Sequence, residues 1–147
     1  MTKTLHLSLI TPERVLQEED GVTQVTVATE QGEVTILPGH VDFVAQLKPG
    51  RVLVRKGDVE ELLAISTGLL AVDGGVRVRI LADTADRAGD LDERAIQKAK
   101  EEAQRVMNEK RLVDDEAFAR AAAALERELA KERVLRNRAY KDPMRRK

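Results

Sequence analysis

Turn signals recur at short intervals through residues 1–82 and then stop. They include Pro49–Gly50, and they separate short apolar runs such as residues 52–54 and 76–81. Runs this short, with no helical segment between them, predict the strands of an antiparallel sandwich or barrel. In the last run Arg77 and Arg79 alternate with Val and Ile, which indicates a strand with one charged and one packed face.

The first predicted strand carries one of the two histidines of the chain. Leu5, Leu7 and Leu9 alternate with His6 and Ser8, which is the period of a strand with one buried face. His6 is therefore expected to point outward. The sequence names no partner for its ring, and a solvated strand histidine explains it better than a catalytic role does.

The composition changes a little past the middle of the chain. Lys, Arg, Asp and Glu make up 19 of residues 1–82 but 32 of residues 83–147, and no glycine follows Gly89. High charge density, with Ala and Leu between the charges, is typical of long exposed helices. We therefore expect two parts, a β part over residues 1–84 and a helical part over residues 85–147.

Within the helical part the apolar residues repeat at helical spacing. Leu91 is followed by alanines in steps of four, and Phe118 begins a second stripe that runs to Leu129. Residues 108–113 interrupt the two stripes, and Asp114 is suited to cap a new helix directly after them. The fold class is thus predicted to be β followed by α, ending in an antiparallel hairpin of two helices.

No combination of residues suggests an active site. The chain has no Cys and only two His, and no glycine-rich run ends in Gly-Lys-Ser or Gly-Lys-Thr. A nucleophile with its base, a thiolate metal site and a phosphate loop all lack their residues. We expect a protein that is not an enzyme, with no catalytic residue and no metal site. No apolar run approaches the roughly 20 residues of a membrane span.

The most specific signal is the stretch Gly32–His40. Pro38 fixes its own φ at about −65°, and Gly39 can take the positive φ that the third position of a type II turn requires. A rigid, exposed turn is therefore expected after a short apolar run. Glu33 and His40 bracket it.

The run from Ala28 to His40, with Pro49–Gly50 further on, resembles the epsilon subunit of the F-type ATP synthase. The family pattern is Gly-Glu, one or two apolar residues, Leu-Pro-Gly-His and a second Pro-Gly, and the chain has all of it in order. Two positions depart: Thr35 stands where glycine is usual, and Asp42–Phe43 replaces a small residue and proline. A helical hairpin after a β-sandwich matches the same family, so the resemblance covers most of the chain.

The resemblance implies a non-catalytic rotor subunit of the central stalk. Its sandwich would bind the gamma subunit, and its turn would rest on the polar loops of the ring of c subunits, so that proton-driven rotation reaches gamma. The protein would be a peripheral part of the complex at the cytoplasmic face of the cell membrane, touching the membrane only through that complex. The c-ring contact would comprise Glu33, Leu37, Pro38, Gly39 and His40.

The resemblance gives the helical hairpin a regulatory role. The hairpin would lie folded against the sandwich, or extend along gamma and block ATP hydrolysis. Eight Lys or Arg stand against two acidic residues in the segment 131–147. Compensation of the helix end accounts for only part of this excess, so an acidic partner surface is favoured. Residues that would face the beta subunit are Arg127, Lys131, Arg133, Arg136 and Arg138.

Some epsilon subunits bind ATP in the folded hairpin, through Ile or Leu, Asp, two residues, then Arg-Ala. Residues 91–95 of this chain read Leu-Asp-Glu-Arg-Ala, one residue short between Asp and Arg. One residue rotates a helical side chain by about 100°, and Glu101 and Glu102 would repel phosphate. ATP binding is therefore disfavoured, and we expect no cofactor. The residues that such a site would use are Asp86, Leu91, Asp92, Arg94, Ala95, Arg127 and Lys131.

Two other functions stay open on the sequence alone. One is a free ATP-sensing module, testable by nucleotide titration, that would use Asp92, Arg94, Arg127 and Lys131. The other is a non-rotary adaptor or nucleic-acid-binding sandwich, which only the basic tail supports. Tyr140 is the one aromatic near that tail for stacking on bases, so a protein partner is favoured over nucleic acid.

Overall fold

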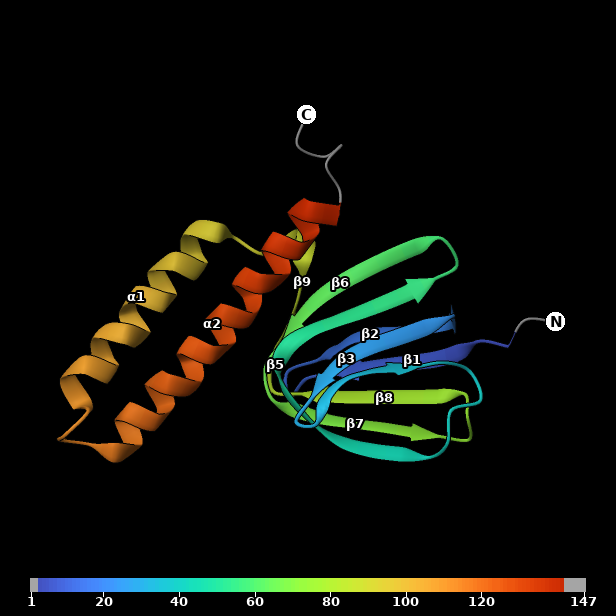
Figure 1. Ribbon diagram of the computed structural model, residues 1–147, viewed down its shortest axis with the longest axis horizontal. Coiled ribbons are helices and arrows are strands. Elements are labelled where there is room, and N and C mark those ends of the chain that lie inside the picture. Colours follow the sequence, from blue (N-terminus) through green and yellow to red (C-terminus); the bar gives the residue numbers. More distant parts are fainter. Residues whose placement is uncertain (1–2, 142–147) are drawn as a thin grey trace.

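A computed structural model describes residues 3–141 of the chain, and side chains as far as Asn137. The described residues form strands in the N-terminal part and helices in the C-terminal part, as the change of period predicts (Figure 1). The strands are β1 (Leu5–Ile10), β2 (Val15–Val22), β3 (Gln24–Thr29), β4 (Gly32–Ile36), β5 (Phe43–Lys56), β6 (Val59–Ile65), β7 (Gly68–Asp73), β8 (Arg77–Ala82) and β9 (Ala85–Arg87). A 3-10 turn, η1 (Ala88–Asp90), leads into helices α1 (Glu93–Lys110) and α2 (Asp115–Lys141).

The strands form one continuous sheet that folds back on itself into a sandwich. Its order is β2-β1-β8-β7-β5-β3-β4, and β6 pairs with both β5 and β9. Among the described strands every pair is antiparallel except β1 with β8, which run parallel from His6 beside Arg77 to Ile10 beside Leu81. The predicted class, an antiparallel β-sandwich followed by a two-helix hairpin, is confirmed, with this one parallel pair as an addition.

Strand β5 belongs to both layers of the sandwich. Its first residues, from Phe43 to Leu47, pair with β7, and its last residues, from Gly50 to Lys56, pair with β6. The expected turn at Pro49–Gly50 is therefore wrong. The chain passes through these residues as a corner within one strand, where a proline without an N–H group interrupts the ladder between two sets of partners.

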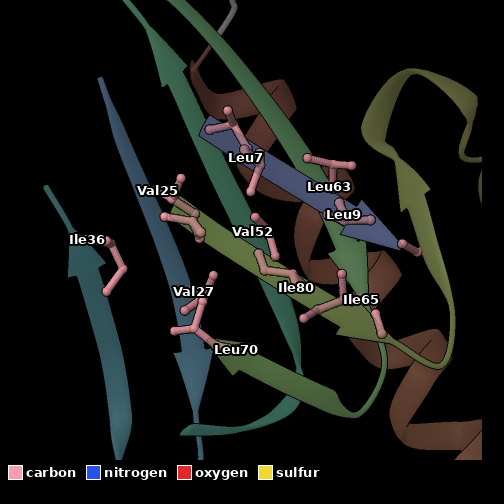
Figure 2. Packing of buried hydrophobic residues seen from close by; sticks show 14 of the residues in the cluster. Leu7, Leu9, Val25, Val27, Ile36, Val52, Leu63, Ile65, Leu70 and Ile80 are labelled. Atoms are coloured by element: carbon pink, nitrogen blue, oxygen red, sulfur yellow. The ribbon is translucent and has the colours of Figure 1, made fainter. Parts of the chain in front are cut away.

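Aliphatic side chains from nearly every strand fill the space between the layers. Figure 2 shows leucine, isoleucine and valine side chains of both layers pointing toward one another. All are almost completely buried, and burial of one such side chain contributes about 1.5–3 kcal/mol. The residues labelled in Figure 2 are Leu7, Leu9, Val25, Val27, Ile36, Val52, Leu63, Ile65, Leu70 and Ile80.

Aspartates begin both helices. The carboxylate of Asp92 accepts hydrogen bonds from the amides of Arg94 and Ala95, at 3.0 and 3.4 Å. Asp114 accepts from the amides of the third and second residues that follow it, both at 3.1 Å. The cap at Asp114 is the one that the sequence predicted, and both caps satisfy amide groups that a helix start leaves unpaired.

Helix α2 lies between α1 and the sandwich (Figure 1). It contacts β5 and β6. Its residues Ala130 and Val134 are fully buried, and Val134 packs in one cluster with Ala64 and Ala88, against which the partly buried Leu62 and Leu91 also pack. The boundary expected between residues 84 and 85 falls at the start of β9, which pairs with β6 and brings the chain to α1 along the sandwich.

Gly68 allows β7 and β8 to approach closely, and a Cβ atom there would lie 2.2 Å from the carbonyl oxygen of Leu81. We predict that Gly68→Ala destabilises the protein by about 1–3 kcal/mol, because the backbone of a paired strand must move. Chemical denaturation of the full chain measures this. Thr67→Ala, at the exposed neighbouring position, is the control and should stay within about 0.5 kcal/mol of wild type. Equal stability of the two variants would contradict the expectation.

Candidate functional site

The turn between β4 and β5 has the conformation that its sequence predicts. Gly39 has a φ of 89°, and the amide of His40 donates to the carbonyl oxygen of Leu37 at 3.1 Å. Leu37 keeps 52% of its surface exposed, and Val41 keeps 74%. The result is a tight turn that presents apolar side chains to solvent, at the end of the sandwich away from the helices (Figure 1).

The neighbouring β7–β8 hairpin fixes this turn in place. The amide of Gly39 donates to the carbonyl oxygen of Gly75 at 2.7 Å, and Asp42 accepts from the amide of Gly74 at 3.0 Å. The rings of His40 and Phe43 pack with their centroids 5.6 Å apart. Asp42 and Phe43, which together form one of the two departures from the family pattern, therefore both make contacts that hold the loop. Sequence reasoning missed these contacts because the Gly74–Gly75 partner lies about 30 residues further along the chain.

Glu33 lies apart from the turn. It sits near the start of the edge strand β4, whereas Leu37 follows the end of that strand, about 13 Å further along at the usual rise per residue. Its carboxylate accepts from the Nε of Arg51 at 3.2 Å. Of the five residues predicted for the c-ring contact, the structure groups Leu37, Pro38, Gly39 and His40, with Glu33 on the same sheet edge.

A second exposed apolar surface lies on the outer face of β7 and β8. Leu69 and Leu81 are paired in register and expose 48% and 49% of their surfaces. Beside them a cleft of about 460 Å³ is lined by Leu81 and by Ile10 of β1. The sequence did not identify these residues as a binding surface. The one sign of it in the sequence is Leu81, an apolar residue at an outward position of the strand, two residues after Arg79.

His6 has partners that the sequence could not name. Its Nδ1 lies 2.6 Å from Asp20, its Nε2 lies 3.3 Å from Glu18, and the hydroxyl of Ser8 donates to Glu18 at 2.5 Å. These hydrogen bonds, the one to Asp20 first, raise the pKa of His6 above its ordinary value. The hydrogen bond from Ser8, followed by that from His6, lowers the pKa of Glu18. The hydroxyl of Ser8 is directed to a carboxylate and away from the imidazole, so the group is not arranged as a nucleophile with its base.

The basic residues of α2 contact acceptors of this same chain. Arg136 pairs with Glu132 at 2.8 Å, and Arg133 donates to the carbonyl oxygen of Pro49 at 3.5 Å. Lys131 lies 3.1 Å from Glu128 and 3.7 Å from Asp86. Arg127 lines a cleft between α2 and the sandwich. The side chain of Arg138, the last residue of the predicted beta-subunit set, is outside the described residues.

The residues of the predicted nucleotide site are divided among separate places. Asp86, Arg127 and Lys131 line one cleft of about 430 Å³. Leu91 lines a different one, and Arg94 lines a third. Asp92 and Ala95 take part in the cap of α1. The structure thus brings three of the seven residues together.

Glu132 joins the two helices at the open end of the hairpin. It accepts from Gln97 and from Lys100 of α1, both at 2.7 Å, and pairs with Arg136 of its own helix. The hydrogen bond from Lys100, followed by that from Gln97, lowers the pKa of the Glu132 carboxyl below its ordinary value of 4.5. The carboxylate form is therefore the one that stabilises the hairpin.

Two further findings on the described residues concern membrane-spanning helices and metal sites. No helix in this part of the chain is long and apolar enough to cross a membrane. Within residues 3–141 no group of His, Cys, Asp and Glu is arranged to hold a metal ion. The described residues present exposed apolar side chains, together with charged contacts between the helices and the sandwich.

Comparison with known proteins gives consistent matches. Residues 4–88 match the family model described as ATP synthase, Delta/Epsilon chain, beta-sandwich domain. The ATP synthase epsilon chain of Anoxybacillus flavithermus (strain DSM 21510 / WK1) is 42% identical over 74% of this chain and 79% of its own length. The ATP synthase epsilon chain of Xanthomonas euvesicatoria pv. vesicatoria (strain 85-10) is 40% identical over 91% of this chain and 96% of its own.

Chains in solved structures of ATP synthases have the same fold. A chain in the Euglena gracilis mitochondrial ATP synthase, determined as OSCP/F1/c-ring in rotational state 1, superposes with a TM-score of 0.77 and 27% identity, covering 92% of this chain and 83% of that one. A chain of the Tetrahymena thermophila mitochondrial ATP synthase, from the central stalk and c-ring, shares the fold with a TM-score of 0.52 at 18% identity, over 61% of this chain and 72% of that one.

The lowered pKa of Glu132 gives the hairpin a pH dependence. A carboxyl with a depressed folded-state pKa contributes stability above its ordinary pKa, and this is lost as the pH falls through the folded-state value. We predict that the open end of the hairpin loosens below about pH 4.5, and that Glu132→Gln loosens it at neutral pH by about 0.5–1.5 kcal/mol. Distances between spin labels on cysteines introduced at Lys98 and Glu126 measure the opening.

Glu102→Gln is the matched control for this test. Glu102 pairs with Arg105 of its own helix, and that hydrogen bond also lowers its pKa. Its loss should change the stability of α1 without widening the distance between helices. If Glu102→Gln and Glu132→Gln broaden the label distances equally, Glu132 does not join the helices in the way described.

Proposed function

Because this chain belongs to the family of ATP synthase epsilon chains and so is a central-stalk subunit of the F-type ATP synthase, we propose that it couples rotation of the c-ring to gamma and regulates ATP hydrolysis through its helical hairpin. In this role it is non-catalytic, and catalysis belongs to the beta subunits. It is attached to the cytoplasmic face of the membrane only through the complex.

The turn after β4, which hydrogen bonds hold against the β7–β8 hairpin, is the observation that best supports the coupling role. Two hydrogen bonds from the β7–β8 hairpin hold a loop whose exposed side chains include Leu37 and Val41. A surface that is rigid before it binds loses little conformational entropy on binding. Transmission of rotation also requires a rigid contact, because a flexible loop would deform under load. We propose this loop as the c-ring contact, with Glu33 contributing from the same edge.

The exposed leucines on the outer face of β7 and β8 favour gamma as the second partner. Leu69 and Leu81 form an apolar surface next to a cleft, and the N-terminal sandwich is the part that the family model matches. Exposed apolar surface beside a concave region is typical of a protein-binding site. Its position on the sandwich leaves the helices free for another role.

The contact between α2 and the sandwich supports the regulatory role. Its apolar cluster consists of Ala64, Ala88 and Val134, with the partly buried Leu62 and Leu91 packed against them. This cluster is much smaller than the core of the sandwich, so the hairpin is held weakly by comparison. A weakly held element can exchange between two packed positions. We propose that the extended hairpin blocks hydrolysis, with the basic residues of α2 facing an acidic segment of beta.

An ATP-sensing role is the second candidate function, and one observation favours it. Asp86, Arg127 and Lys131 line the same cleft between the hairpin and the sandwich. The remaining residues of the nucleotide motif lie elsewhere, so the rotor role has the stronger support. A non-rotary adaptor that binds nucleic acid has only the basic tail in its favour, and most of that tail is outside the described side chains.

The c-ring contact can be tested at Leu37. We predict that Leu37→Asp weakens attachment of the stalk to the ring by roughly tenfold or more, because burial of one leucine is worth about 1.5–3 kcal/mol. ATP-driven proton pumping in membrane vesicles with the reconstituted complex should fall accordingly, while binding to gamma is retained. Val59→Asp, at another exposed position in the β5–β6 hairpin, is the control. Loss of gamma binding by Leu37→Asp would show that the turn serves the fold instead.

The inhibitory contact can be tested by charge reversal. We predict that replacing Arg133, Arg136 and Arg138 together with Glu relieves inhibition of ATP hydrolysis, and that added salt mimics this because exposed charges are screened over roughly 8–10 Å. ATPase activity of the catalytic complex across a salt series measures it. Arg120→Glu, at an exposed position of the same helix, should leave inhibition unchanged.

The charge-reversed chain must be shown to remain bound through its sandwich. Loss of the Arg136–Glu132 pair costs little by itself, since exposed ion pairs within a helix are worth about 0.3–0.5 kcal/mol. Equal ATPase activity with wild-type and reversed chains at low salt would mean that the basic end does not contact beta.

A further inference from the structure

The cleft between α2 and the sandwich contains charges of both signs. Its volume is about 430 Å³, and it is bounded by the β1–β2 turn, the β8–β9 link, β9 and the facing sides of both helices. Its basic side chains are Arg14, Arg127 and Lys131, and its acidic side chains are Glu13, Asp83, Asp86 and Glu128. The lining thus has four carboxylates and three cationic groups. An anionic ligand would need an excess of cationic groups.

Lys131 already has two anionic partners in this cleft. Its ammonium group lies 3.1 Å from Glu128 and 3.7 Å from Asp86. The Lys131 side chain is 22% exposed and that of Glu128 is 11% exposed, so this pair is shielded from solvent more than an ordinary surface pair. A carboxylate this buried requires a cation beside it, because an unpaired buried charge is strongly unfavourable.

One contact of this group, Lys131 with Asp86, connects α2 to the sandwich, and Glu128 pairs with Lys131 within the helix. Glu128 and Lys131 are one turn apart on α2, whereas Asp86 belongs to β9, which is hydrogen-bonded to β6. We call the group of Asp86, Glu128 and Lys131 the Lys131 bridge. It lies directly beside Ala130, which is fully buried. The bridge therefore holds the same part of α2 that makes the small apolar contact.

A nucleotide in this cleft would meet the carboxylates of the bridge. To bind Lys131, a phosphate oxygen must come within about 3 Å of the ammonium group. Glu128 already occupies that range at 3.1 Å, and Asp86 lies just beyond it at 3.7 Å. Like charges this close repel strongly in a partly buried site. The side chains that would bind the rest of the nucleotide, Leu91 and Arg94, line other surfaces.

We infer that the chain's own carboxylates occupy the anion-binding position in this cleft, so that the Lys131 bridge fastens α2 to the sandwich without a nucleotide. Docking of the hairpin is then independent of ATP and sensitive to salt. It follows that Lys131 becomes available to an acidic partner only when α2 leaves the sandwich, a consequence that rests on the proposed regulatory function. The bridge itself is a property of the isolated chain.

The test uses the isolated full-length chain with spin labels on cysteines introduced at Thr67 and Ala123, both exposed, since the natural sequence has no Cys. Lys131→Gln should lower the ratio of docked to undocked hairpin about fivefold, the effect of roughly 1 kcal/mol. Asp86→Asn should lower it similarly, because Lys131 and Asp86 form the contact between α2 and β9, and the double variant should lose less than the sum of the two. Glu126→Gln, which removes an exposed carboxylate of α2, should have no effect.

MgATP and tripolyphosphate are the probes for the anion-binding position. Calorimetric titration of wild-type chain with either should detect no binding at ligand concentrations up to about 1 mM, a limit that corresponds to about −4 kcal/mol, and the label distances should not change. The Asp86→Asn and Glu128→Gln double variant should bind tripolyphosphate at least tenfold more tightly than wild type does.

Two outcomes would overturn the inference. The first is submillimolar binding of MgATP by wild-type chain with an increase in the docked population. The second is strictly additive effects of Lys131→Gln and Asp86→Asn on docking, which would mean that the two residues do not act together. Neither measurement involves gamma, beta or the c-ring, so failure of the rotor role would leave both results interpretable.

Discussion

The sandwich depends on β5, a strand shared by both layers. Because its two halves pair with β7 and with β6, the hydrogen-bond ladder continues around the corner and the inner faces of the layers meet. With no Trp and only two Phe, the core must be assembled from Leu, Ile and Val. Each contributes modestly, so residues from nearly every strand have to converge on one space. A sheet folded back on itself satisfies that requirement.

The sequence predicts the features that depend on neighbouring residues. The order of strands and helices, the cap at Asp114 and the turn at Pro38–Gly39 follow from local spacing and backbone preference. The parallel pairing of β1 with β8 and the corner in β5 were not predicted, because alternation fixes which face is buried and leaves the choice of neighbouring strand open.

The same distinction applies to the candidate site. The excess of basic residues on α2 is evident in the sequence, and it favours a partner surface because a sequence shows charge without distance. The acceptors that these residues contact in the folded chain include Asp86 and the carbonyl oxygen of Pro49, which are remote in sequence. The Asp42 contact with the β7–β8 hairpin was missed for the same reason. Long-range polar contacts thus account for most of what sequence reasoning did not find.

The turn after β4 and the docked hairpin lie at opposite ends of the sandwich (Figure 1). About 20 Å of strand β5 separates Phe43, beside the turn, from Pro49, which accepts from Arg133 of α2. Removal of α2 from the sandwich would break no hydrogen bond of the turn, since those bonds come from Gly74 and Gly75. In a rotor subunit of the proposed kind, transmission of torque and inhibition of ATP hydrolysis would therefore depend on separate parts of the chain. The turn would stay bound to the c-ring while the hairpin inhibits ATP hydrolysis.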